Sequence, residues 1–441
     1  MKNIAILGAG IGGMAAAYDL VRSGNQVTIY EAAEAAGGLA SGFKEPHWDW
    51  SLEKYYHHWF TSDRHILGLI NELGWRENVI FKRPYTVVYW EGKFYPFDSI
   101  FSNIPAFILR RFPLPDAIRY GLFGAYLRFT PWWKPLEKVT ASEWTRSRFG
   151  KRVYELQWKP LLVSKFGERY AEQVNMAWLW ARLTARSTRL GTFAGGFQAF
   201  ADRLAGHLTQ MGVRIHFSTP VSRLEPQTQG LLTLTTPKGP VQYDQCLSTT
   251  SPALLARLAP TLPPEYLNGL LNLKSMGAVV MVLALKQQLS EQGYYWYNLP
   301  KAAGFPFLAL VEHTNFLSPE HYGGDHLVYA GDYLETDHEY FDLSQDELLE
   351  RFLPAFPRIN ASFKPDWIRK TWLSRTPYAQ PVPFVNHSHN IPAIQTPISG
   401  LYFASMSQVY PWDRGTNFAV EIGRRAARIM LGTQSAQGSG E

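Results

Sequence analysis

The chain of 441 residues has almost no cysteine: Cys246 is the only one. One thiol cannot form an intramolecular disulfide, and it cannot supply the paired thiolates of a cysteine-based metal cluster. The adjacent pair His57 and His58 would point to opposite faces of a strand, and no second pair with ligand spacing follows. We therefore expect no metal site, and a protein of a reducing compartment, with the cytoplasm as the default location.

Long apolar runs are also missing. A membrane-spanning helix needs roughly 18 or more consecutive apolar residues. The longest candidate, Met276 to Leu285, is much shorter and is bounded by Ser275 and Lys286. This run predicts a buried strand.

Neither sign of charge dominates, since 43 basic and 37 acidic residues give a net charge of +6. The basic residues are spread along the chain and form no block that alternates with aromatics, so we expect no nucleic-acid partner. The small positive balance is compatible with an anionic substrate, an acidic membrane surface, or solubility alone. The tail 433–441, rich in Gly, Ser and Gln, is expected to be disordered. Nothing in the sequence specifies an oligomeric state.

The strongest pattern that is present lies at the start of the chain. In order, it comprises an apolar strand, a G-x-G-x-x-G turn, a helix, a second strand and an acid, at residues 4–7, 8–13, 14–23, 26–30 and Glu31. In such a unit the helix N-terminus offers unpaired amides to a pyrophosphate, and the acid accepts hydrogen bonds from the adenosine ribose. The pattern predicts an adenine dinucleotide site made by Gly8, Gly10, Ile11, Gly12, Gly13 and Glu31.

A second glycine turn follows at residues 35–42, with Gly37, Gly38, Leu39 and Ala40 at its centre. A nucleotide fingerprint followed by a Gly-Gly turn resembles the flavoprotein superfamily of amine oxidases, protoporphyrinogen oxidase, phytoene desaturases and, more distantly, UDP-galactopyranose mutase. The resemblance implies FAD, with this second turn against the flavin and its diphosphate. Leu39 stands where many members have an arginine.

Two later segments extend the resemblance. Val221 ends a strand whose counterpart contacts the adenine, and residues 400–430 resemble the closing flavin motif of strand, turn and helix. Ser405-Met406 replaces the usual Gly-Asp of this motif, which leaves Asp413 as the substitute acid. The implied contacts in the motif are Asp413, Thr416, Asn417, Phe418 and Ala419. Cys246 lacks the context of a covalent flavin cysteine, so the FAD is expected to be non-covalent.

The resemblance implies an α/β fold in which a Rossmann-type, glutathione-reductase-like FAD-binding domain carries an inserted α+β substrate domain. The FAD-binding domain is expected at residues 1–60, 190–250 and 395–432. The substrate domain, a helical part plus an antiparallel sheet, is expected at residues 61–189 and 251–394.

The implied activity is that of an FAD-dependent oxidoreductase, in which a hydride passes from a hydrophobic or anionic small molecule to the flavin. A flavin-dependent isomerase without net oxidation, and a binding or carrier role, are the alternatives. His57 and His58 resemble the histidine segment that desaturases and the mutase place beside the flavin, although one core and one solvent-facing histidine would give the same pattern. Residues 312–315 and 378–380 are candidate cavity groups, or simply a cap and a turn.

Two further features bear on partners. Residues 97–135 are aromatic, basic and interrupted by proline, which is typical of a segment in a lipid interface and also of the roof of an apolar cavity. Arg182 follows the apolar run 178–181, where a buried guanidinium needs a carboxylate or an anionic ligand as its partner.

Overall fold

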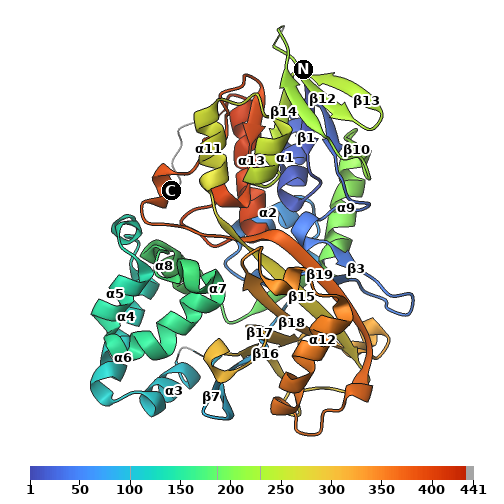
Figure 1. The fold of residues 1–441 in the computed structure, drawn as a ribbon. Coiled ribbons are helices and arrows are strands. Elements are labelled where there is room, and N and C mark those ends of the chain that lie inside the picture. The colour runs from blue at the N-terminus through green and yellow to red at the C-terminus, as the bar shows by residue number, and fades with distance from the viewer. Residues whose placement is uncertain (100, 186, 229, 434–441) are drawn as a thin grey trace.

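The computed structural model describes residues 1–99, 101–185, 187–228 and 230–433. Two large sheets organise the chain (Figure 1): a parallel one near both termini and a mostly antiparallel one below it in the view, with a lobe of helices beside the second. Residues 434–441, most of the predicted disordered tail, lie outside the described residues. Among the helices of the described segments, none is both long enough and apolar enough to cross a bilayer.

The first sheet has five parallel strands in the order β10-β2-β1-β14-β20. Their bounds are β1 Asn3–Leu7, β2 Gln26–Tyr30, β10 Arg214–His216, β14 Gln245–Ser248 and β20 Leu401–Phe403. β1 and β2 coincide with the strands predicted at residues 4–7 and 26–30, and β20 lies in the predicted closing motif at residues 400–430. In register, Ile4 lies opposite Val27 on one side and Gln245 on the other. Strands from three distant parts of the chain therefore form one Rossmann-type sheet.

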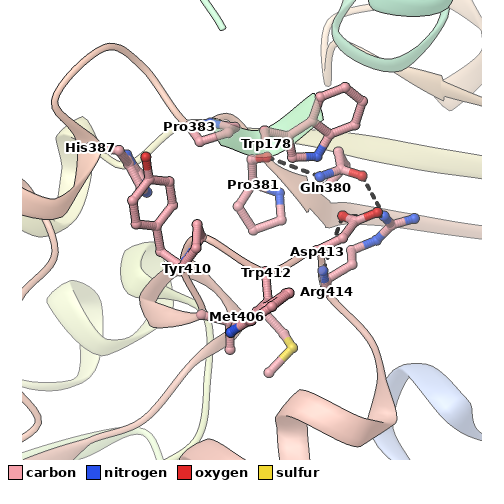
Figure 2. Close-up of a pocket in the computed structure, with 12 residues that line it drawn as sticks. Trp178, Gln380, Pro381, Pro383, His387, Met406, Tyr410, Trp412, Asp413 and Arg414 are labelled. Atoms are coloured by element: carbon pink, nitrogen blue, oxygen red, sulfur yellow. Dashed lines mark hydrogen bonds and ion pairs between the residues drawn. The ribbon is translucent and has the colours of Figure 1, made fainter. Parts of the chain in front are cut away.

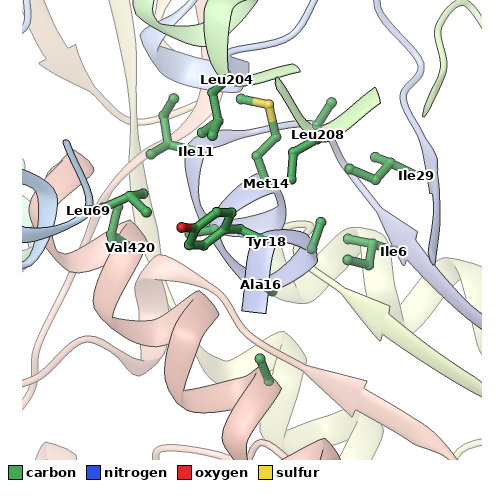
Figure 3. Close-up of a cluster of buried hydrophobic side chains, with 14 of the residues drawn as sticks. Ile6, Ile11, Met14, Ala16, Tyr18, Ile29, Leu69, Leu204, Leu208 and Val420 are labelled. Carbon is green, nitrogen blue, oxygen red and sulfur yellow. The ribbon is translucent and has the colours of Figure 1, made fainter. Parts of the chain in front are cut away.

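Successive side chains of β1 enter different cores, as expected when both faces of a sheet are covered. Ile4 and Ile6 pack in a core with helices α1, α2, α9 and α13 (Figure 3). These helices span Ile11–Arg22, Arg64–Glu72, Phe197–Gln210 and Thr416–Met430. Ala5 and Leu7 pack on the opposite face. That face is covered by β11 Arg223–Pro226, β12 Leu232–Thr236, β13 Gly239–Tyr243, α10 Pro252–Leu258 and α11 Pro264–Asn272.

The second sheet has seven strands in the order β19-β15-β18-β17-β16-β7-β8, and only the β16/β7 pair is parallel. The bounds are β15 Ser275–Leu285, β16 Tyr294–Asn298, β17 Ala309–Glu312, β18 His326–Leu334, β19 Ile368–Pro381, β7 Tyr85–Trp90 and β8 Lys93–Pro96. The buried strand predicted at Met276 to Leu285 lies within β15, whereas β19 was not predicted. Together with α12 Gln345–Phe352, this sheet encloses its own core.

A helical lobe occupies the lower left of Figure 1. It contains α3 Asn103–Arg111, α4 Leu114–Phe129, α5 Ala141–Phe149, α6 Lys151–Val153, α7 Lys159–Ala171 and α8 Met176–Ala185. Two small sheets complete the fold: β3 Gly42–Phe43 pairs with β4 Leu52–Glu53, and β9 Leu190–Phe193, which follows α8, pairs with β5 Trp59–Phe60 and β6 Val79–Lys82.

Candidate active site

The glycine turn between β1 and α1 is closed by contacts that tolerate no side chain. Gly8 has φ of +108°, and a Cβ on Gly13 would lie 2.2 Å from the carbonyl oxygen of Gly8. Gly10 is the N-cap of α1, no side chain caps this helix, and its first turn carries no acid. The helix N-terminus, which includes Ile11 and Gly12, therefore keeps its positive dipole end open for an anion.

The second glycine turn lies directly against the first. The Gly37 amide donates to the carbonyl oxygen of Ala9 at 2.9 Å, and a Cβ on Gly38 would lie 3.2 Å from the Cα of Gly10. Ala40 is buried behind the turn, whereas Leu39 is 37% exposed. The structure thus brings together the two turns that the sequence assigned to one cofactor.

Glu31 holds the glycine turn through its carboxylate. Oε2 accepts from the Ala9 amide at 2.7 Å, and Oε1 accepts from the Ala33 amide at 2.8 Å. The Glu31 carbonyl accepts from the Thr219 amide at 2.8 Å. That contact brings the segment of Val221 to the end of β2, where Val221 packs in the same cluster as Tyr30. The ribose contact of Glu31 stays a prediction, as does the adenine contact of Val221.

The start of α13 completes the ring around the first turn. A Cβ on Gly12 would lie 2.9 Å from the carbonyl oxygen of Ala419, so α13 crosses α1 at backbone contact. No side chain caps α13, and its first turn carries no acid. Two open helix N-termini and glycine-only contact surfaces fit an adenine dinucleotide with its pyrophosphate.

Three α13 residues that were predicted to contact FAD have side chains that interact with other parts of the protein. Thr416 Oγ1 accepts from Trp59 Nε1 at 2.8 Å, and Asn417 Oδ1 accepts from the amides of His65 at 2.8 Å and Ile66 at 3.2 Å. Phe418 stacks on Trp412 with ring centroids 5.8 Å apart. These side chains fix α2 and residues 59–66 against the closing motif.

His57 and His58 point to different surroundings. His57 Nδ1 lies 2.6 Å from the carbonyl oxygen of Tyr55, and the His57 ring packs 5.7 Å from Phe197. Because a carbonyl oxygen only accepts, Nδ1 carries the proton and Nε2 is left as an acceptor. Burial, and then the positive charge of Arg414, lower the pKa of His57 to about 4. The imidazole is therefore neutral at neutral pH.

The His58 ring packs instead among aromatics, 5.2 Å from Tyr56 and 4.8 Å from Phe60. The structure does not bring the two histidines together, because neighbouring residues of an extended segment face opposite sides. His57 lies near the closing motif, since the positive charge of Arg414 contributes to lowering its pKa. The catalytic roles predicted for both residues stay predictions.

Asp413 lies between two arginines. Its Oδ2 is 3.2 Å from Nη1 of Arg182, and its Oδ1 is 3.7 Å from Nη1 of Arg414. Burial, and to a smaller degree Arg414, lower the pKa of Arg182, while Asp413 opposes that shift. The partner that Arg182 was expected to need is thus the same carboxylate that the sequence assigned to the cofactor.

A pocket opens beside this ion pair (Figure 2). It lies between α8, the end of β19 and residues 406–414, with Trp178, Gln380 and Trp412 among its walls. Arg414 donates to Gln380 Oε1 and to the Tyr333 hydroxyl, and its guanidinium lies over the Tyr333 ring. Figure 2 shows Gln380, Asp413 and Arg414 together on one side of the pocket, with Tyr410 and His387 on the other.

Sequence reasoning missed Arg414 and Tyr333 as members of this site. Arg414 directly follows Asp413 inside the closing flavin motif, and this position could have indicated that Arg414 belongs to the site. Tyr333 lies on β18 with no motif around it. Of the two candidate cavity clusters, residues 378–380 reach the site through Gln380. The cluster 312–315 does not: Glu312 accepts from the amides of Leu289 and Ser290, and His313 contacts the Tyr322 hydroxyl.

Fold and site define a class of protein: a Rossmann-type adenine dinucleotide-binding unit joined to a second sheet, with a charged pocket at their junction. A family model described as flavin-containing amine oxidoreductase matches residues 11–431, so the chain belongs to this family. Flavin-containing amine oxidase A of Bos taurus is 22% identical, over 98% of this chain and 85% of that protein.

Solved structures share the fold. Reduced UDP-galactopyranose mutase superposes with a TM-score of 0.76 at 15% identity, covering 99% of this chain and 96% of that one. Putrescine oxidase bound to putrescine gives 0.69 at 17% identity, covering 98% and 99%. The predicted fold class is confirmed. Family membership confirms the predicted enzyme class and cofactor: the chain is an FAD-dependent oxidoreductase.

Proposed function

We propose that this oxidoreductase acts on a hydrophobic small molecule that also carries an anionic group, and that it removes a hydride from a C–H bond of that molecule. The observation that carries the proposal is the pair of guanidinium groups on one carboxylate at the pocket. In the described part of the chain, the ion pairs of Arg182 and of Arg414 are both made with Asp413.

The charge count at this site favours an anion. The side chain of Arg182 is 11% exposed, that of Arg414 is 23% exposed, and that of Asp413 is 22% exposed. Two cations that share one carboxylate in so little solvent leave one positive charge to be balanced. A carboxylate or phosphate on the substrate would balance it, because a guanidinium presents a planar fork of donors to such groups.

The remaining wall of the pocket supports an apolar body for the same substrate. Trp178 and Trp412 offer indole faces, and Pro381 and Pro383 add apolar rings. Such a wall excludes water from the bound molecule and contributes dispersion contacts. A substrate with an apolar part against the indoles would place its anionic part against Arg414.

His57 supplies a proton acceptor on the side of Arg414. Its Nδ1 proton is held by the Tyr55 carbonyl, so Nε2 is the ring nitrogen able to accept a proton. When bound, FAD supplies the hydride-accepting flavin N5. The protein contributes orientation, exclusion of water and a neutral acceptor.

The test is anaerobic mixing of the FAD-loaded enzyme with matched substrate pairs, each a hydrophobic carboxylic acid and its methyl ester. Bleaching of the flavin by the acid but not by the ester is the expected result. Arg414→Gln should raise KM for the acid by about 10- to 100-fold, as expected from loss of a charged hydrogen bond. Arg169→Gln removes a charge from an exposed ion pair on α7 and should leave KM unchanged. Equal bleaching by acid and ester would overturn the anionic requirement.

A flavin-dependent isomerase acting on a nucleotide sugar is the second candidate. The same two guanidinium groups favour it, because they also suit a diphosphate, and the fold is shared with UDP-galactopyranose mutase. The same mixing experiment separates the two functions. Substrate that bleaches the oxidised flavin supports oxidation, whereas turnover that begins only after prior reduction of the enzyme supports isomerisation.

A further inference from the structure

The exposed apolar side chains of this protein gather on one part of its surface. In the described residues, 15 large hydrophobic side chains are exposed, and eight of them lie between 101 and 132. They are Phe101, Leu109, Leu114, Ile118, Leu122, Tyr126, Phe129 and Trp132. Single exposed hydrophobics are ordinary, but a contiguous group of this kind marks an interaction surface.

Helix α4 forms the centre of this group. Leu114, Ile118, Leu122, Tyr126 and Phe129 follow one another at intervals of four, four, four and three residues, which places them on one side of a helix. We name these five side chains the α4 face; Leu122 is 65% exposed and Phe129 is 80% exposed. The opposite side of α4 is already buried, since Ala117 and Leu127 pack in the core of the helical lobe. The α4 face is therefore additional to what folding requires.

Within the segment that carries the α4 face, the exposed charges have one sign. Between 101 and 138, every charged residue of the exposed class is a cation: Arg110, Arg119, Lys134 and Lys138. The two acids of this stretch are withdrawn from the surface. Asp116 is half-buried beside Arg152, and buried Glu137 accepts from the Ser388 hydroxyl at 2.9 Å. An apolar strip bordered by cations is complementary to a surface with an apolar interior and anionic headgroups.

We propose that the α4 face binds the surface of a membrane that contains anionic lipids, with α4 lying in the plane of the interface. Leu122 and Phe129 enter the acyl boundary, while Arg110, Arg119 and Lys134 contact headgroup phosphates. A second copy of the chain is disfavoured as the occupant, because a two-fold contact would bring the same cations toward each other. A 16-residue helix is about 24 Å long, which gives the apolar strip enough length for stable interfacial contact.

The position of α4 links this surface to the pocket. Thr184 Oγ1 on α8 donates to the Leu127 carbonyl at 3.0 Å, and Trp180 Nε1 donates to the Thr130 carbonyl at 2.8 Å. Helix α8 also carries Trp178, which lines the pocket, and Arg182, which pairs with Asp413 of the pocket wall. Helix α8 therefore contacts both the α4 region and the candidate active site.

The experiment is flotation of the FAD-loaded enzyme with vesicles of phosphatidylglycerol and phosphatidylcholine in equal parts, compared with phosphatidylcholine alone. The wild type should float with the anionic vesicles and should be released by high salt, since the headgroup contacts are screened. The double variant L122S/F129S should lower the floating fraction about tenfold or more, because two apolar anchors are lost. Arg119→Gln with Lys134→Gln should weaken flotation at low salt only.

The matched control is L271S/F217S. Leu271 lies on α11 and is 51% exposed, and Phe217 follows β10 and is 36% exposed, so the same residue types are removed from the surface beside the parallel sheet. This control should float like the wild type. Flavin absorbance and circular dichroism establish that each variant is folded. Absence of wild-type flotation, or equal loss in the control, would overturn the proposal. So would a dimer in analytical ultracentrifugation that L122S/F129S dissociates, because it would assign the α4 face to a second copy.

Discussion

A Cβ atom on Gly423 would lie 2.1 Å from the carbonyl oxygen of Gly12, so helices α13 and α1 meet backbone to backbone directly behind the glycine turn. The two open helix N-termini hold their positions around one anion site because of this contact. It also joins the first motif of the chain to the last one.

Gly423→Ala should force these helices apart. Overpacking of this kind costs about 1–3 kcal/mol, and the displaced turn should also reduce the bound FAD. Chemical denaturation and the ratio of flavin to protein absorbance measure the two effects. Gly206→Ala is the control, because a Cβ on this α9 glycine meets nothing within 4 Å and should stabilise the helix by up to about 1 kcal/mol. Equal effects of the two substitutions would contradict the contact argument.

Glu31→Gln should weaken FAD binding by about tenfold. The Glu31 carboxylate accepts hydrogen bonds from the backbone amides of Ala9 and Ala33. Glutamine has only one acceptor oxygen and no negative charge, so one bond is lost and the other is weakened. Fluorescence titration of the apoprotein with FAD gives the dissociation constant. Exposed Glu34 lies in the same loop, and Glu34→Gln should leave that constant unchanged.

Sequence patterns could predict the parallel sheet because its strands are short apolar runs bounded by glycine or polar residues. The predicted strand 26–30 coincides with β2 for this reason. Strand β19 was missed because Arg369, Lys370 and Ser374 interrupt its apolar residues, and no tight turn links it to the strands that precede it. Its pairing with β15 comes from the tertiary fold, with Ser374 opposite Val280.

In the candidate site, too, local patterns could be predicted from the sequence, whereas contacts between distant residues could not. The glycine turns, Glu31 and the closing motif could be found locally, because each is a short pattern with its own backbone requirement. The pairing of Arg182 with Asp413 joins residues 231 positions apart, so no local pattern contains it. The sequence indicated only that Arg182 needed an anionic partner.

Glu53 should make stability fall as pH rises through a window from about 4.5 to 7. Burial raises the pKa of this carboxyl to about 7, although it accepts from the Phe197 amide at 2.9 Å. In that pH window, Glu53 therefore keeps its proton in the folded protein but releases it in the unfolded chain. The contribution of Glu53 to stability is lost as the pH rises. Glu53→Gln mimics the protonated form. Its stability relative to wild type should rise by up to about 3 kcal/mol between pH 4.5 and 7 in urea unfolding. A difference that does not change with pH would contradict the assignment.

His57 should titrate well below a free imidazole, and Arg414 should be part of the reason. Histidine NMR of the wild type should place its pKa near 4, and the H57F spectrum identifies the signal. Arg414→Gln removes a nearby positive charge and should raise this pKa, with burial keeping it below the ordinary value of about 6.5. Arg169→Gln, at an exposed ion pair, should not move it. An unshifted His57 signal in Arg414→Gln would show that the two groups are not coupled.

The ion pair of Arg182 with Asp413 is open to a double-mutant cycle. Asp413→Asn leaves two partly buried guanidinium groups without a carboxylate and should destabilise the protein by up to about 3 kcal/mol, the lower end for a fully buried pair. Arg182→Met should cost less, because Asp413 keeps Arg414. The double variant should be more stable than the sum of the single losses by about 1–3 kcal/mol, which is the coupling expected for groups in contact. Flavin content separates the two roles of Asp413. If its carboxylate also contacts FAD, flavin is lost in both variants that carry Asp413→Asn. If it serves only Arg182 and Arg414, stability is partly recovered in the double variant and flavin stays bound.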